Sequence, residues 1–202
     1  MAGRRGGKVH PQCPRNAVSG GVAAGRTGEK IVSQNALIAV TSDAIRGLLQ
    51  AAVGEAAPIT LSHPAQSREG GDALGLQLLR IGLPPMMRSV PVIGADGRRL
   101  HAVQNLQLDY LVDPRSSDPL QGQHLLGCAL AALARQPSLD VPVFTPLLSR
   151  PDLLQSLLPA ALGITLRALE LPLGEQATLW SALAAPAHAA LFWRAEVTWQ
   201  AQ

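Results

Sequence analysis

Residues 191–199 read LFWRAEVTW, and this stretch decides the fold because it alternates as a strand does. Its odd positions are all apolar: Leu191, Trp193, Ala195, Val197 and Trp199. The polar positions between them are Arg194, Glu196 and Thr198. Every second side chain therefore faces a core, at the period of a half-buried β-strand. The sequence predicts a final sheet strand that begins near Leu191.

The segment before that strand predicts a helix. Leu179, Trp180 and Leu183 fall on one helical face, and Pro186 ends the pattern. Four of the six aromatic residues of the chain lie in residues 171–202. Each large ring buries about 150 to 250 Å², so rings gathered here indicate either the centre of the core or a partner surface. Our interpretation is core packing, with Trp180 and Trp193 buried against the sheet.

The charge of the chain is divided unevenly along its 202 residues, which suffice for one domain with a tail. Residues 1–34 hold six basic groups and one acidic group, whereas residues 35–202 hold 11 basic and 13 acidic groups, a net charge of −2. A surface that binds nucleic acid needs clustered Lys and Arg, and no such cluster occurs past residue 34. We therefore expect no nucleic-acid partner.

Targeting and cysteine patterns indicate an intracellular place of synthesis. The chain has no run of eighteen apolar residues, and its basic start is not followed by an apolar segment of seven residues, so we expect neither membrane insertion nor secretory export. Its two cysteines, Cys13 and Cys128, give no disulfide framework. Cys128 lies on an apolar helical face, which predicts an inert buried thiol. We expect synthesis and assembly in the cytoplasm.

The first 34 residues predict a disordered basic tail, because they are rich in Gly, Arg and Ser and have no apolar period. Two interpretations of this tail stay open. In one, residues 1–31 are absent from the native protein and translation starts at the codon of Val32. In the other, the tail is a real basic arm that reaches an acidic partner. We expect residues 35–202 to form a single domain.

The middle of the chain predicts alternating strands and helices. Helices are expected at 36–53, with Gly47 as a weak point, at 121–135, and after Ser149 as a capping residue. Strands are expected at 74–83, 100–112 and 162–171, with a short strand at 58–63 and an edge strand at 141–145. Loops are expected at 67–72, 91–99 and 113–119. The sequence thus predicts an α+β fold: an antiparallel or mixed sheet of about four to six strands with helices packed mainly on one face.

The sequence shows no arrangement typical of catalysis or metal binding. His63, His101, His124 and His188 stand alone, without the spacing that places two metal ligands on one face. Asp109 and Asp113 share a strand face but lie about 13 Å apart by strand rise, too far to act as a coupled pair. We expect no catalytic residue, no cofactor and no metal.

Four segments, in order, resemble one protein family. They are NALIAVT with IRGLL in residues 35–49, LQLDYLV at 106–112, HLLG at 124–127, and LPL at 171–173 followed by LWSAL at 179–183. This set is similar to the cap proteins, or tail terminators, of contractile injection systems. The shared core positions are Leu108, Tyr110, Leu126, Leu179, Trp180 and Trp193. The chain departs from the family at 83–89, LPPMMRS, where only Arg88 and a proline match an expected Asn-Pro-x-x-Arg-Asn motif.

This resemblance implies a non-enzymatic structural subunit. Family members form a hexameric ring on the last layer of an inner tube, end its growth and anchor the terminal sheath layer. The implied partners are further copies of the chain, the tube protein and the sheath protein, and the chain would leave the cell as part of an extracellular particle. The alternative is an adaptor or baseplate-associated domain of a related particle.

A closed ring needs a heterologous contact repeated around an axis. Two proline-rich segments are the candidates for that contact, at 86–99 and 113–119, because they can hold charges at a subunit boundary. The candidate interface residues are Arg88, Arg98, Arg99, Asp113 and Asp118.

Overall fold

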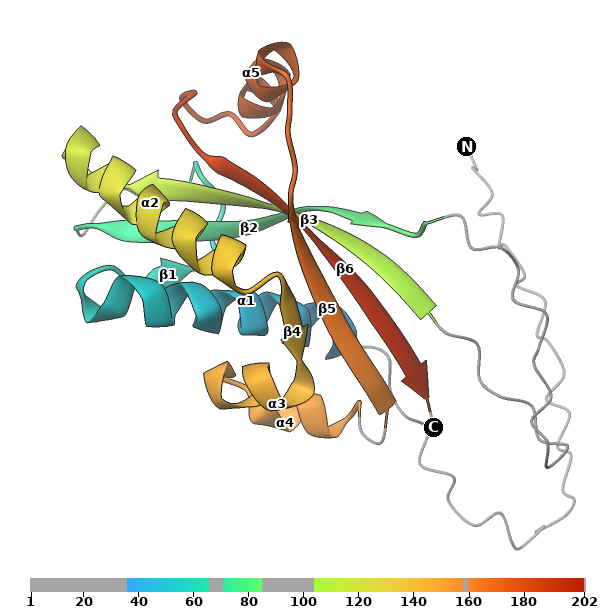
Figure 1. The fold of residues 1–202 in the computed structure, drawn as a ribbon. Coiled ribbons are helices and arrows are strands. Elements are labelled where there is room, and N and C mark those ends of the chain that lie inside the picture. The colour runs from blue at the N-terminus through green and yellow to red at the C-terminus, as the bar shows by residue number, and fades with distance from the viewer. Residues whose placement is uncertain (1–35, 66–70, 85–103, 158–159, 202) are drawn as a thin grey trace, which may run out of the picture. The chain divides into compact units, whose positions relative to one another are not determined.

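The computed structural model describes residues 36–65, 71–84, 104–157 and 160–201. In this part of the chain one mixed sheet has the strand order β1-β2-β3-β6-β5-β4 (Figure 1). The strands are β1 (Ile59–Thr60), β2 (Ala73–Gly82), β3 (Gln104–Arg115), β4 (Ser138–Asp140), β5 (Ala160–Ala168) and β6 (Leu191–Ala201). β1 and β2 run parallel, and every other neighbouring pair is antiparallel. The predicted α+β class with a mixed sheet is confirmed.

Most helices cover one face of this sheet. They are α1 (Leu37–Val53), η2 (Gly54–Ala56), α2 (Pro119–Arg135), α3 (Val141–Phe144), η3 (Thr145–Leu147), α4 (Pro151–Gln155) and α5 (Leu173–Ala182). Figure 1 shows α1 and α2 side by side along that face, with α3 and α4 next to α1. Helix α5 stands apart from all of them. The predicted arrangement, with helices mainly on one face, is therefore observed.

The main core lies between the sheet and α1 and α2. The side chains of Val40, Ala44 and Leu49 on α1 are fully buried there, as is Ala129 on α2. Strand β6 contributes its odd positions to this core: Trp193, Ala195, Val197 and Trp199 are buried and Leu191 is half-buried. The alternation of residues 191–199 thus predicted correctly which face of the strand is buried in the main core. Tyr110 of β3 is buried in the same core, its hydroxyl lies 2.9 Å from the Ser42 hydroxyl, and burial raises the pKa of the Tyr110 phenol.

Gly47 has a packing role that helix propensity alone does not show. A Cβ atom at this position would overlap the backbone oxygen of Leu147 and lie 2.8 Å from the Leu147 Cβ. Glycine therefore lets η3 approach the middle of α1 closely. The predicted weak point of the helix is the place where another segment of the chain contacts it.

The expected loop at 113–119 is shorter than predicted. Asp113, Pro114 and Arg115 continue β3, and Pro114 pairs with Leu74 of β2. The pairing of β3 with β6 ends at Val112, so beyond that residue β3 has β2 as its neighbour on one side only. A proline is tolerated where a strand lies at the sheet edge, which is why its presence did not end the strand.

The edge strand predicted at 141–145 and the helix cap predicted at Ser149 are both wrong. Residues 141–144 form the short helix α3, because Pro142 fits the first turn of a helix and Phe144 buries its ring completely. The edge strand is β4, the three residues before it. Ser149 does not cap α4: its hydroxyl donates to the carboxylate of Asp43, 2.7 Å away. The predicted loops at 67–72 and 91–99 fall largely or wholly outside the described residues.

Asp43 of α1 holds the segment before α4 in place. Its carboxylate accepts hydrogen bonds from the Ser149 amide at 2.7 Å and the Arg150 amide at 2.9 Å, and it pairs with Arg46 at 2.9 Å. Burial alone would raise the pKa of Asp43, but the hydrogen bonds from Ser149, Arg150 and Arg46 outweigh it and hold the pKa below its ordinary value. One carboxylate therefore joins two segments more than 100 residues apart in the sequence.

We expect the Asp43 contacts to make folding stability sensitive to acid. The pKa of this carboxyl is lower in the folded chain, so its contribution is present above the ordinary pKa of 3.8 and is lost as the pH falls through the folded-state pKa. Asp43→Asn should lower the free energy of unfolding at pH 7 by about 1 to 3 kcal/mol and flatten its decline in acid. Urea unfolding between pH 7 and pH 3 measures both effects. The control is Asp152→Asn, because Asp152 pairs with Arg150 at the surface. An unchanged acid limb in Asp43→Asn would contradict the assignment.

Candidate interaction surface

The face of the sheet opposite α1 and α2 carries a second, smaller apolar cluster. Its buried members are Leu111 of β3, Phe192 of β6 and Trp180 of α5. Leu111 and Phe192 are cross-strand partners, and the Trp180 ring is 3 % exposed. Half-buried residues surround them: Leu79, Leu169, Leu171, Leu179, Leu183, Ala185 and Ala190. We call residues 169–190, which leave β5 and return to β6, the α5 arm.

The base of the α5 arm is fixed by a backbone hydrogen bond, since the Leu169 amide donates to the Phe192 carbonyl at 2.9 Å. Beyond it, Trp180 is the one residue of α5 that is buried. Leu173, at the start of α5, is 83 % exposed. The arm is therefore a projecting element whose most buried contact with the sheet is the Trp180 ring.

Beside the arm, charged side chains from four neighbouring strands lie close together. Arg194 of β6 donates two hydrogen bonds to Asp109 of β3, at 2.6 and 3.0 Å, and Arg80 of β2 lies 3.7 Å from the same carboxylate. The hydrogen bonds to Asp109 raise the pKa of the Arg194 guanidinium. Arg167 of β5 pairs with Glu196 of β6 at 2.6 Å. Arg80 and Arg167 are mostly exposed, so this part of the sheet presents a charged, hydrated surface.

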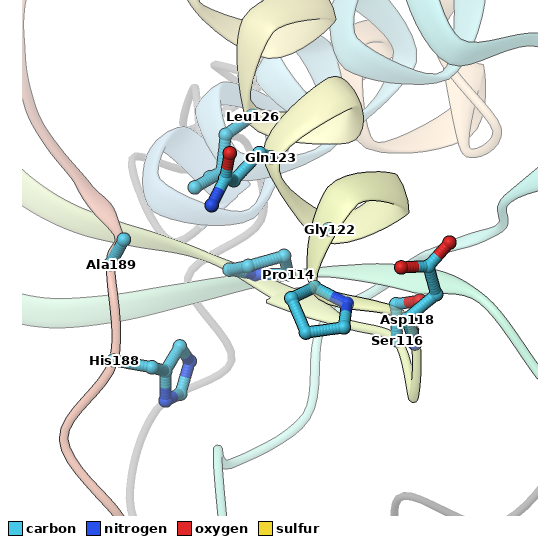
Figure 2. Close-up of a pocket in the computed structure, with 9 residues that line it drawn as sticks. Pro114, Ser116, Asp118, Gly122, Gln123, Leu126, His188 and Ala189 are labelled. Atoms are coloured by element: carbon cyan, nitrogen blue, oxygen red, sulfur yellow. Dashed lines mark hydrogen bonds between the residues drawn. The ribbon is translucent and has the colours of Figure 1, made fainter.

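A shallow cavity of about 270 Å³ opens between the start of α2 and the segment that leads into β6 (Figure 2). Figure 2 shows Gln123 and Leu126 on the α2 side and His188 and Ala189 on the other side. The lining residues are Pro114, Ser116, Asp118, Pro119, Gly122, Gln123, Leu126, His188 and Ala189. The lining is mainly apolar, with polar groups at the rim, as in a contact site for another protein surface.

Asp118 forms the polar rim of this cavity. It is the N-cap of α2: its carboxylate accepts a hydrogen bond from the Leu120 amide at 3.0 Å, and Pro119 occupies the first turn. The Ser116 hydroxyl accepts a hydrogen bond from the Asp118 amide at 3.1 Å. Asp118 is exposed.

Asp113 lies elsewhere than predicted. It is 1 % exposed and belongs to β3 rather than to a surface loop. Arg115 donates to it at 3.3 Å and reaches the hydroxyl and carbonyl of Ser62 at 2.5 and 2.7 Å. A Cβ on Gly75 would overlap the Asp113 carboxylate, so this glycine makes room for the pair. Arg115, paired with Asp113, thus joins strand β3 to Ser62 in the segment after β1.

The structure divides the other sequence-derived positions between the two faces of the sheet. Leu108, Tyr110 and Trp193 are buried in the main core, whereas Trp180 and the half-buried Leu179 belong to the α5 cluster. Leu126 is half-buried and lines the cavity. Arg88, Arg98 and Arg99 lie outside the described residues.

Neither the Asp109–Arg194 pair nor the contacts of Asp43 could be seen in the sequence. Asp109 and Arg194 each occupied a polar position of a predicted strand, so a known strand register would have revealed the pair, but register cannot be read from alternation. No local pattern pointed to Asp43. Cys128 is half-exposed rather than buried, and its sulfur lies 3.7 Å from Nε2 of His124 one helical turn away.

Within the described ranges, no group of three or more His, Cys, Asp or Glu side chains is placed to hold a metal ion. None of the helices in the same part of the chain is long and apolar enough to cross a membrane. What the described surface offers is a projecting arm, a shallow cavity and a charged sheet face, all of which suit contact with other proteins.

Solved structures of other proteins share this fold. The chain resembles the sheath/tube terminator of an extracellular contractile injection system, PVC, in its extended state, with 17 % identity and a TM-score of 0.59 over 82 % of this chain and 57 % of that one. It also resembles the tube-terminating cap of the anti-feeding prophage, with 19 % identity and a TM-score of 0.57 over 80 % of this chain and 54 % of that one. The chain spans little more than half the length of these two proteins. No curated protein matches the sequence.

These likenesses define the class of the fold, an α+β domain also found in terminator and cap proteins of contractile particles. The family follows from the sequence itself. The profile of the Pvc16 N-terminal domain matches residues 40–199, and the chain belongs to this family. The resemblance that the four short segments indicated is therefore confirmed.

Proposed function

We propose that this chain is a structural cap subunit of a contractile injection system, which assembles into a ring, ends the growth of the inner tube and anchors the last layer of the sheath. The observation that carries the proposal is the match to the Pvc16 N-terminal domain over residues 40–199, together with a shared fold in two terminator structures. The role is non-enzymatic in this account. Assembly takes place in the cytoplasm, and the subunit leaves the cell in the finished particle.

The ring contact is assigned to the outward side of α2 and the cavity beside it. Leu120 of α2 is 74 % exposed and Leu130 is 46 % exposed, and both lie on the helix that forms one wall of the cavity. Apolar side chains exposed on one helix favour contact with another protein surface. Asp118 supplies a charge at the rim, and Arg88, Arg98 and Arg99 keep their proposed place at the subunit boundary. We do not place Asp113 at the subunit boundary, because its side chain is buried within the subunit.

Measuring the mass of the assembled chain tests this ring contact. We expect light scattering after size exclusion to give about six times the 21.2 kDa of one chain, either alone or on tube fragments. Leu120→Glu places a charge on the outward side of α2 and should reduce the assembled fraction at least tenfold, because an unpaired charge at an interface costs well over 1.4 kcal/mol. The matched control is Leu61→Glu, since Leu61 is 57 % exposed but lies outside α2.

Two outcomes would count against the proposal. Equal loss of assembly in both variants would remove the ring contact from α2. A ring that forms but fails to bind tube ends would favour the alternative, an adaptor or baseplate-associated domain with the same fold.

A further inference from the structure

The sheet face that points away from α1 and α2 carries a row of arginines beside the α5 cluster. Strand register places Arg80 of β2 opposite Asp109 of β3, and Asp109 opposite Arg194 of β6. Arg194 is in turn opposite Arg167 of β5. We call these four residues the arginine row. Like charges directly opposite each other weaken a sheet, so folding alone does not favour placing Arg194 next to Arg167.

Two carboxylates offset only part of this positive charge. Asp109 accepts hydrogen bonds from Arg194 at 2.6 and 3.0 Å, and Glu196 pairs with Arg167 at 2.6 Å. Arg80 lies 3.7 Å from Asp109, which is already bonded to Arg194, and no hydrogen bond joins Arg80 to a described residue. The three arginines therefore exceed the two acidic side chains by one positive charge.

The arginine row is accessible from outside the molecule. The side chains of Arg80 and Arg167 are 62 % and 63 % exposed. Helices α1 and α2 cover the opposite face, and α5 stands away from the sheet (Figure 1). Asp140 of β4 lies on the same face as the row, but it pairs with Gly163, four residues and about 13 Å along β5 from Arg167. An acidic surface of another molecule can therefore reach the two exposed guanidinium groups.

The side of the chain that holds the proposed ring contact is acidic. Residues 118–134, most of α2 with its N-cap, and residues 169–190, the α5 arm, contain three acidic side chains and no Lys or Arg. The acidic residues are Asp118, Glu170 and Glu175, and all three are exposed. Both segments line the cavity beside α2, so they form one continuous surface (Figure 2). We call this surface the acidic side.

We propose that the acidic side of one copy of this chain binds the arginine row of the next copy. The inference rests on the proposed cap function, and it names the second surface that a heterologous ring contact requires. Glu170 and Glu175 of one arm pair with Arg80 and Arg167 of the neighbouring subunit. Each surface thereby receives charge of the opposite sign, which selects this pairing over contacts between two acidic sides or two arginine rows.

Charge reversal on the full chain tests the contact, with light scattering after size exclusion as the measurement. One variant carries Arg80→Glu with Arg167→Glu, and the other carries Glu170→Arg with Glu175→Arg. Each should reduce the assembled fraction by about tenfold or more, because like charges then meet across the interface. An equal mixture of the two variants should assemble as the wild-type chain does, since they can alternate around a ring with an even number of subunits.

The control is Arg150→Glu, an arginine that is 63 % exposed and lies outside both surfaces, and it should assemble normally. All the substituted side chains are exposed, so melting temperatures should stay within about 2 °C of the parent. If the Arg80 and Arg167 reversal does not fold, Arg80→Gln with Arg167→Gln removes the same charges and should reduce assembly by about threefold or more.

Three results would overturn the contact. Normal assembly of the folded variants would show that these charges do not meet another subunit. Failure of the mixture to assemble, when each variant alone is folded and monomeric, would show that the two surfaces are not partners. In both cases the wild-type chain still assembles, so the cap function stands. A wild-type chain that stays monomeric even with tube fragments would refute the ring and this contact together.

Discussion

Replacing Trp193 with alanine is expected to lower the free energy of unfolding by about 3 to 5 kcal/mol, the range for a large aromatic side chain removed from a core. Trp193 is 7 % exposed and lies near the start of β6, paired with Tyr110 of β3 and Ala168 of β5. Its indole nitrogen has no hydrogen-bond partner among the described residues, so the loss is one of packing. Urea unfolding at pH 7 measures it.

Trp193→Phe is the control for this prediction, because it keeps an aromatic ring and should cost clearly less than alanine. A melting temperature of Trp193→Ala within about 2 °C of the parent would contradict the core assignment, since 3 kcal/mol corresponds to a shift of roughly 6 °C or more. The ring would then belong to an interface between subunits.

Trp180→Ala should produce a loss in the same range, about 3 to 5 kcal/mol, with a different distribution over the chain. The Trp180 ring holds the α5 arm on Leu111 and Phe192, and no other residue of α5 is buried. We therefore expect hydrogen exchange to accelerate most in residues 169–190 and the main core to keep more of its protection.

The two tryptophan variants separate the two faces of the sheet. Trp193→Ala should weaken protection in α1, α2 and the sheet together, because its ring lies in the core they share. Equal exchange patterns in the two variants would contradict the division into a main core and an arm cluster. A parent-like melting temperature for Trp180→Ala would place its ring in an intersubunit contact instead.

Local periodicity predicted the regular elements well. The alternation of residues 191–199 gave both the strand β6 and the face that it buries, because period two is a direct consequence of strand geometry. The apolar spacing of residues 36–53 and 121–135 likewise predicted α1 and α2. Such patterns work where one side of an element is buried and the other is hydrated.

Local patterns failed where an element is short, where a strand has a neighbour on one side only, or where a side chain bonds to a residue far away in the sequence. Pro114 suggested a loop, yet it lies in a strand that has a single neighbour at that point. The apolar run at 141–144 suggested a strand, yet four residues are too few for periodicity to separate strand from helix. The role of Ser149 depends on Asp43, 106 residues away, and no local rule contains that partner.

The candidate interaction surface could be predicted only in part. Asp118 is exposed at the cavity rim, but Asp113 is buried, because the strand that contains it is longer than the proline suggested. The α5 arm and its contacts with the sheet depend on which strands pair, and strand order cannot be derived from composition or periodicity. The family resemblance supplied the functional expectation that residue physics alone could not give.

If this chain ends tube growth, electron microscopy of growing tubes can show it. Purified tube protein is polymerised with increasing amounts of the chain, and tube length and the position of bound subunits are measured. We expect shorter tubes as the chain is added, with a ring of subunits at tube ends only. Tubes of unchanged length, or subunits bound along the tube wall, would contradict it.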